Sequence, residues 1–212
     1  NAQWIADKQL RAARVKHGEL AADQFENVRD RWYPKTTPAA LEAIVLRKEA
    51  PTDAELTAAI QSQFACALQR AATEEELQKY VALTRESIQL GGNTSGLRQM
   101  LVTVLLESEF LYRLEFGAGK PDEHGRVPLA PREASFAIAY ALGDRGPDAA
   151  LLQAANAGQL TTPEDYRREV ERLLADKSYF RAPVDPALNG NHIQSHVVSH
   201  PKLVRFFREF FG

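Results

Sequence analysis

The sequence predicts an all-α fold, arranged either as one irregular multi-helix bundle or as two packed helical subdomains. Three observations support this prediction. Long stretches are rich in Ala, Glu, Gln, Lys and Arg, which favour helix. Residue patterns that start a helix recur along the chain. No long window shows the apolar–polar alternation that is typical of a half-buried strand.

The composition is that of an ordinary globular protein, with 44% hydrophobic and 25% charged residues in a chain of 212. The formal net charge of −2 gives no electrostatic case for binding to nucleic acid or to an anionic membrane. No apolar run approaches the roughly 20 residues that a membrane-spanning helix needs. We therefore expect neither a nucleic acid partner nor a transmembrane segment.

In the first half of the chain, local sequence signals place several helices. Helices are expected over 3–16, 19–31 and 38–48. Thr52 with Glu55, and Thr73 with Glu76, form capping-box patterns, and each pattern predicts the start of a further helix. The glycines and asparagine at 91–93 are expected to break the chain before the next helix begins.

That next helix, over about 96–116, is apolar on nearly every side, which is typical of a helix surrounded by protein. We expect it to be the buried central helix of the first module. Glu107 and Glu109 interrupt its apolar run, and Glu109 is expected to form an ion pair with Arg113 one turn later. Cys66 lies in an apolar helical context and is expected to be a small buried side chain.

Glycine and proline are concentrated in residues 117–130, which makes this stretch the expected boundary. The predicted organisation is an N-terminal helical module over 1–116, a Gly/Pro linker over 117–130 and a second helical module over 131–212, truncated at its C-terminus. In the second module, helices are expected from Pro131, over 148–157 and from Thr162, which is followed by proline and two acidic residues.

A last helix is expected to start at Pro201 and to carry a face of phenylalanines. Its candidate interaction residues are Phe206, Phe207, Phe210 and Phe211. Burying each phenylalanine contributes roughly 1.5–3 kcal/mol, so this face requires a partner surface in this chain or in its continuation.

The candidate metal ligands are three histidines with a spacing of four, His192, His196 and His200. Two histidines one helical turn apart can hold a divalent metal, and neutral imidazole is the usual axial ligand of haem iron. Pro201 disfavours helical geometry at His200, and the zinc-protease pattern His-Glu-x-x-His is absent. Phosphate-binding, dinucleotide-binding and nucleophile-elbow motifs are also absent, and no catalytic residue is predicted.

Two stretches of the chain together resemble a known family. The first runs from 72–77 to 101–113 and ends in Phe110-Leu111-Tyr112-Arg113. The second covers 129–176, with matching segments at 133–135, 140–142, 147–152, 157–160 and 170–176. They resemble the planctomycete-type large exported multidomain proteins that are made of consecutive domains of unknown function and often carry a cytochrome c-like domain elsewhere in the chain.

The resemblance implies a helical scaffold or docking module of a larger exported, haem-associated protein, located in an extracytoplasmic, periplasmic-type compartment. Its partners would be other domains or subunits of that assembly. No cofactor is evident in this chain itself, although haem is expected in the full-length protein. Two alternatives remain open: part of a metal- or haem-dependent oxidoreductase with His192 and His196 as ligands, or a helical interaction module that uses the phenylalanine-rich helix.

Overall fold

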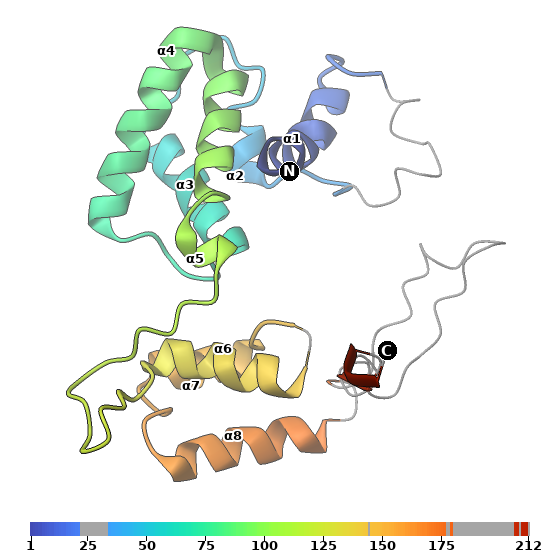
Figure 1. Cartoon of the computed structure of the whole chain (residues 1–212). Helices are drawn as coiled ribbons and strands as arrows, with labels where there is room; N and C mark the ends of the chain where they lie inside the picture. The colour runs from blue at the N-terminus through green and yellow to red at the C-terminus, as the bar shows by residue number, and fades with distance from the viewer. Residues whose placement is uncertain (22–33, 144, 177–178, 180–205, 208, 212) are drawn as a thin grey trace, which may run out of the picture. The chain divides into compact units, whose positions relative to one another are not determined.

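A computed structural model describes residues 1–21, 34–143, 145–176, 179, 206–207 and 209–211. Every regular element within these residues is a helix, which confirms the all-α prediction (Figure 1). The chain divides into two compact units, Asn1–Tyr112 and Arg113–Gly212, and each is described by itself. The predicted modules with a linker over 117–130 stay a prediction.

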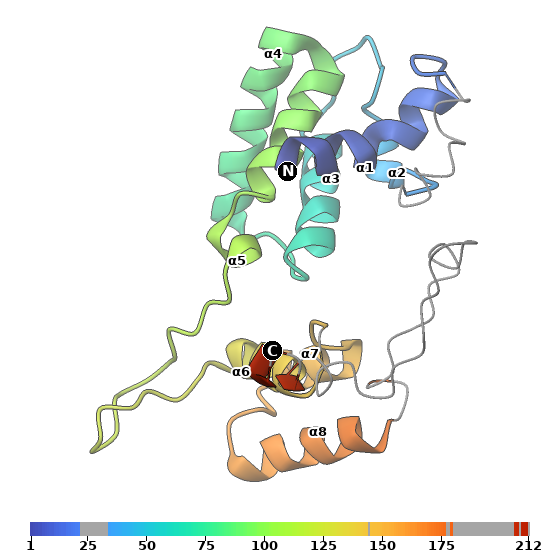
Figure 2. The same ribbon diagram turned by 45° about the vertical axis from the view of Figure 1, so that its right-hand side comes forward.

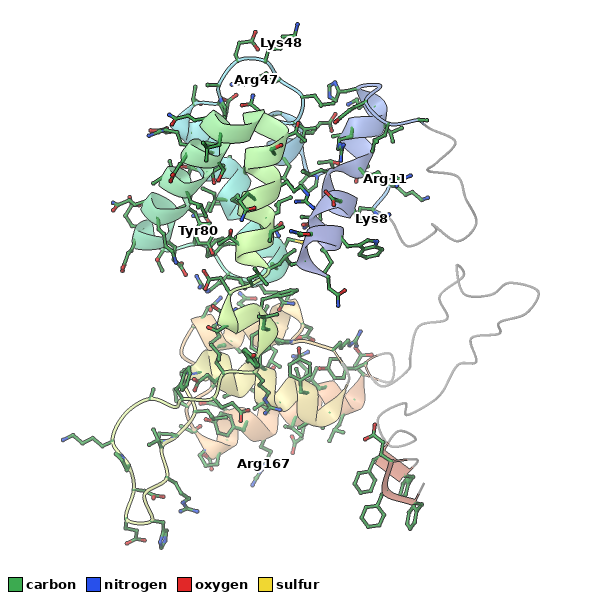
Figure 3. All side chains as sticks on the ribbon, turned by 45° about the horizontal axis from the view of Figure 1, so that its top comes forward. Lys8, Arg11, Arg47, Lys48, Tyr80 and Arg167 are labelled. Carbon is green, nitrogen blue, oxygen red and sulfur yellow. The ribbon has the colours of Figure 1, made fainter. Side chains whose placement is uncertain are left out.

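The first unit consists of five helices among its described residues. These are α1 (Ala2–Lys16), α2 (Ala39–Glu42), α3 (Asp53–Ala67), α4 (Glu74–Val104) and α5 (Ser108–Leu111). Its largest fully buried side chains include Leu10, Leu41, Phe64, Tyr80 and Met100, which come from α1 to α4. The helices thus enclose one shared hydrophobic core, and Figure 3 shows Tyr80 on α4 in this unit.

The predicted capping boxes are present at the starts of α3 and α4. Thr52 accepts a hydrogen bond from the backbone N–H of Glu55, and the Glu55 carboxylate accepts one from the N–H of Thr52. Thr73 and Glu76 make the same reciprocal pair. Because each pair satisfies backbone donors that no helical carbonyl can reach, it fixes the residue at which the helix begins.

The long helix α4 is in fact a hairpin of two helical arms, which Figures 1 and 2 show as a ribbon that doubles back. The turn is at Gly92, whose φ of 80° and ψ of 171° only glycine adopts readily. The predicted break at 91–93 is therefore confirmed. Buried Asn93 secures the turn, since its side-chain amide donates to the carbonyls of Arg47 and Glu49 at 2.7 and 2.8 Å.

Two predictions about the first unit were wrong. The central helix ends at Val104, not at 116, and Leu106 and Phe110 beyond it are exposed. Cys66 is exposed as well, because Phe64 and Leu68 occupy the buried face of their helix and a residue midway between them points to the other side. The helix expected over 38–48 is reduced to α2, and the one over 19–31 lies largely outside the described residues.

The second unit contains α6 (Pro131–Leu142), α7 (Ala149–Asn156) and α8 (Pro163–Ala175). Their starts agree with the predicted ones, and Thr162 caps α8 through the N–H of Asp165. The unit has its own small core, formed by Ala139, Leu151, Ala154, Ala155, Leu160, Leu173 and Tyr179. Small side chains from α6 and α7 allow these short helices to pack closely around the leucines.

The stretch before α6 is an ordered loop tied to that helix. The carboxylate of Glu133 accepts hydrogen bonds from the backbone N–H groups of Phe116, Gly117 and Ala130, each at 2.9 Å. The loop closes on itself where the N–H of Ala118 donates to the carbonyl of Pro128 at 2.8 Å. The carboxylate of Glu133 therefore fixes both ends of the loop to the first turn of α6.

Candidate functional site

The two glutamates that interrupt the apolar run after α4 both have partners within the first unit. The Tyr80 hydroxyl donates a hydrogen bond to Glu107. Glu109 accepts a hydrogen bond from Nε of Arg70 at 2.9 Å. The predicted pair of Glu109 with Arg113 was wrong, because α5 ends at Leu111 and the extended backbone that follows removes the helical i, i+4 spacing. Arg113 instead pairs with its neighbour Glu115.

Arg70 is the centre of this cluster. Its guanidinium binds both carboxylate oxygens of Glu76, at 2.7 and 2.8 Å, and lies over the ring of Phe64 at 5.4 Å. Phe64 in turn meets Tyr80 edge to face, with ring centroids 5.2 Å apart. Glu76 is also the capping-box residue of α4, so one carboxylate links the helix start to the arginine that holds α5.

The pKa values in the cluster follow from these contacts. The hydrogen bonds from Arg70 lower the pKa of Glu76 to about 2, and the same bonds raise the pKa of Arg70. Burial, followed by the bond to Glu107, raises the pKa of Tyr80. These shifts keep Glu76 ionised and the phenol of Tyr80 neutral near pH 7, as expected for a structural network. A general acid or base instead needs a pKa near the working pH.

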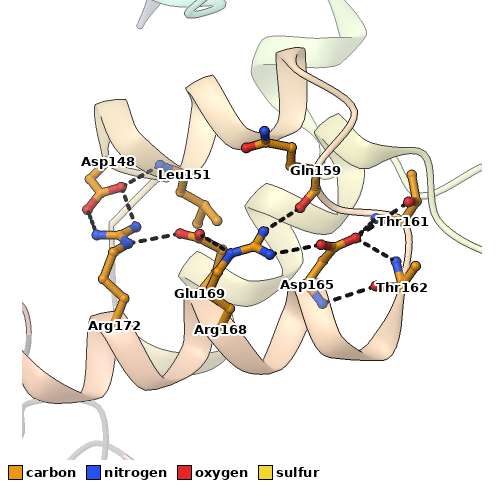
Figure 4. Close-up of polar contacts among 9 residues, drawn as sticks. All are labelled: Asp148, Leu151, Gln159, Thr161, Thr162, Asp165, Arg168, Glu169 and Arg172. Carbon is orange, nitrogen blue, oxygen red and sulfur yellow. Dashed lines mark hydrogen bonds and ion pairs between the residues drawn. The ribbon is translucent and has the colours of Figure 1, made fainter.

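The second unit carries a row of ion pairs along α8 (Figure 4). At one end, Asp148 caps α7 through the N–H of Leu151 at 2.8 Å. Its two oxygens also bind the guanidinium of Arg172, at 2.9 and 3.0 Å. Arg172 donates a further bond to nearly buried Glu169 at 2.8 Å. The pair with Arg172 lowers the pKa of Asp148 and raises that of the arginine.

The row continues through Arg168 to the start of α8. Arg168 binds Asp165 at 3.0 Å and the carbonyl of Gln159 at 2.9 Å, and it lies 3.4 Å from Glu169. Asp165 also accepts from the N–H groups of Thr161 and Thr162, and these bonds lower its pKa. Arg167 projects away from this row (Figure 3). The row joins α7, the connecting turn and α8, so it is a structural brace.

The candidate interaction residues form an exposed aromatic surface. Phe206, Phe207, Phe210 and Phe211 lie in a helical segment and are 55%, 53%, 70% and 74% exposed. We call these four residues the phenylalanine face. Their rings stack in two rows, Phe206 on Phe210 at 5.7 Å and Phe207 on Phe211 at 5.9 Å. The structure thus brings the four rings together.

The three candidate metal ligands, His192, His196 and His200, lie outside the described residues. Within the part of the chain that is described, no group of three or more His, Cys, Asp or Glu side chains is placed to hold a metal ion. His17 lines an open hollow of about 500 Å³ beside α2, together with Leu46. The charged side chains there are engaged, since Glu42 pairs with Lys16 and Arg47 pairs with Glu55.

Sequence reasoning had not predicted the contacts that organise these clusters, which are made by Arg70, Tyr80, Glu133 and Arg172. Each of these residues bonds a partner far along the chain. The separation is 39 residues for Arg70 with Glu109 and 27 for Tyr80 with Glu107. The capping-box pattern indicated Glu76, at one end of the first network. No pattern among neighbouring residues indicated the pair of Arg70 with Glu109 at its other end.

Comparison with known proteins gives one family. Residues 129–187 match the model of a family described as PSD4, protein of unknown function (DUF1592). The match includes α6, α7 and α8 with their brace. No curated protein and no solved structure matches the chain. Among the described helices, none has the length and apolarity to cross a membrane.

Proposed function

We propose that this chain is a helical docking or scaffold module of a larger exported multidomain protein. The observation that carries the proposal is the phenylalanine face, which leaves four large apolar rings exposed in one helical segment. The match to a domain family of unknown function and the resemblance to exported multidomain proteins support the wider setting. Its partner would be another domain or subunit of that assembly.

The arrangement of the face fits this role physically. Residues at i, i+1, i+4 and i+5 cover a broad arc of a helix, as in helices that lie in an apolar groove of a partner. Aromatic anchors dominate the energy of such interfaces. The charged clusters of both units, by contrast, are engaged in holding helices together, as the contacts of Arg70 and Arg172 illustrate.

The test is a titration of this chain against the remaining domains of the full-length protein, produced separately. Replacing Phe207 and Phe211 by serine is expected to weaken binding at least tenfold. The matched control is Leu90→Ser, which removes an 84% exposed leucine from α4 and is expected to leave binding unchanged. Two outcomes would contradict the docking role: the wild-type chain does not bind the remaining domains, or the double variant binds them as tightly as the wild type.

A second candidate function rests on the histidine spacing alone. Part of a haem- or metal-dependent oxidoreductase would use His192 and His196 as ligands, since residues four apart on a helix share one face. Optical absorbance and metal analysis of the full-length protein test this idea. A Soret band that disappears in His192→Ala or His196→Ala supports it, and a colourless, metal-free and stable protein rejects it.

The export that the first proposal assumes has its own test, which is recovery of the full-length protein from the periplasmic fraction.

A further inference from the structure

The chain passes from the first unit to the second through a few residues that are anchored on both sides. On the first side, Glu109 in α5 and Glu107 at its N-terminal cap hold this helix to α4 and to the connection between α3 and α4. Glu109 bonds Arg70 at 2.9 Å, and Glu107 bonds Tyr80. The backbone of α5 closes with the N–H of Tyr112 donating to the carbonyl of Ser108 at 2.8 Å.

On the second side, the anchor is Glu133 at the first turn of α6. Its carboxylate binds the N–H groups of Phe116 and Gly117, both at 2.9 Å. Gly117 has a φ of 76°, and a Cβ there would meet Val127 at 2.7 Å, so the loop approaches as only glycine permits. The guanidinium of Arg113 lies 5.9 Å from the ring of Tyr140, within the same unit.

We propose that residues 112–115 are the hinge of this chain. Their backbone, after the N–H of Tyr112 and before the N–H of Phe116, lies between the two sets of backbone anchors and includes the point where the units divide. A hinge needs a few residues that can absorb changes in φ and ψ while the elements on both sides stay rigid. The side chain of Tyr112 is 67% exposed, and Arg113 and Glu115 are exposed as well, so little packing opposes rotation here.

The hinge is therefore not in the stretch whose composition suggests flexibility. Residues 117–130 contain the glycines and prolines of a linker, yet Glu133 ties both ends of that stretch to α6. Rotation confined to residues 112–115 would let each helical unit reorient as a rigid body. This inference concerns the chain alone and does not depend on the phenylalanine face or on any partner.

Distances between two spin labels in the full chain, measured by pulsed electron paramagnetic resonance, test the hinge. In a Cys66→Ser background, Ser95→Cys labels the first unit and Glu171→Cys labels the second, both at exposed positions. A control pair, Glu75→Cys with Ser95→Cys, lies within the first unit. We expect the distribution between units to be at least twofold wider than that of the control pair. Equal widths would overturn the hinge.

Two variants, with one matched control, test whether the hinge lies at residues 112–115. Glu133→Ala releases residues 116–117 from α6 and is expected to widen the distribution further, whereas Glu123→Ala, at an exposed position in the same loop, is expected to have no effect. Because Glu133 also bonds Ala130, a second variant with two glycines inserted after Glu115 leaves α6 intact and is expected to widen it as well. A wide distribution that neither variant changes would place the hinge elsewhere.

Discussion

Replacing Gly96 by alanine is expected to destabilise the first unit by about 1–3 kcal/mol, the usual cost of overpacking a core. Gly96 is buried where the two arms of α4 meet. A Cβ at this position would lie 2.4 Å from Cγ1 of Ile88, 2.6 Å from its backbone nitrogen and 2.9 Å from its Cα. Ordinary contacts between such atoms are about 3.5–4.0 Å.

The size of this effect follows from which atoms are in the way. A rotamer change of Ile88 can move its side chain but cannot move its backbone nitrogen, so the arms must separate. Separation loosens the packing of core residues such as Leu97 and Met100. Because the clash involves the backbone of Ile88, we expect an overpacking cost at the upper end of this range. The better helix propensity of alanine offsets about 1 kcal/mol of it, which leaves a net loss of about 2 kcal/mol.

The assay is urea unfolding of the full chain followed by tryptophan fluorescence. The two tryptophans of the sequence, at positions 4 and 32, both precede residue 113, so the signal does not come from the second unit. Ser95→Ala is the matched control, since its exposed side chain should change stability by less than about 0.5 kcal/mol. A Gly96→Ala protein as stable as the control would refute the close packing of the two arms.

Three further predictions concern the charged clusters and the cysteine. Glu76→Gln keeps the capping box but removes the charge paired with Arg70. The pKa of Glu76 is about 2 in the fold and 4.5 ordinarily. The ionised Glu76 therefore contributes its full stabilisation of the first unit above pH 4.5 and loses it as the pH falls to 2. We therefore expect the variant to show a smaller fall in the urea midpoint of the first unit over that pH range; an unchanged fall would contradict the network. Asp148→Asn loses the pair with Arg172 but retains a cap for α7, whereas Asp148→Ala loses both. The alanine variant should therefore be about 1 kcal/mol less stable than the asparagine variant, as measured by hydrogen exchange of the α7 amides. Equal exchange in the two variants would argue against the cap. Cys66 should react fully with a thiol reagent in the native protein, whereas reaction only after unfolding would show that it is buried.

The parts of the fold that follow from neighbouring residues could be predicted from the sequence. A capping box joins residues three apart, so Thr52 and Thr73 revealed the starts of α3 and α4. The glycine pair before Asn93 likewise revealed the turn of the hairpin, because only glycine adopts the φ and ψ found at Gly92. In such cases the physical cause and the sequence signal lie in the same few residues.

The remaining features depend on contacts between distant residues. Nothing near Val104 signals a helix end, since neither glycine nor proline follows until Gly117. That end is accompanied by contacts to Arg70 and Tyr80, from elements far earlier in the chain. The exposure of Cys66 depends on which side of α3 meets the core, and an apolar neighbourhood alone does not indicate that side. The phenylalanine face was brought together as its spacing predicts, while its role stays a prediction.

The loop before α6 makes a natural site for displaying a foreign peptide. Its base is closed by Ala118 and Pro128, and at its tip the carboxylate of Asp122 accepts the N–H groups of His124 and Arg126. A segment inserted at the tip would lengthen a loop whose ends are already held together. Doubling the length of such a loop costs only about 0.6 kcal/mol. An epitope or a fluorophore-binding peptide placed there would thus be carried by the second unit without entering its core.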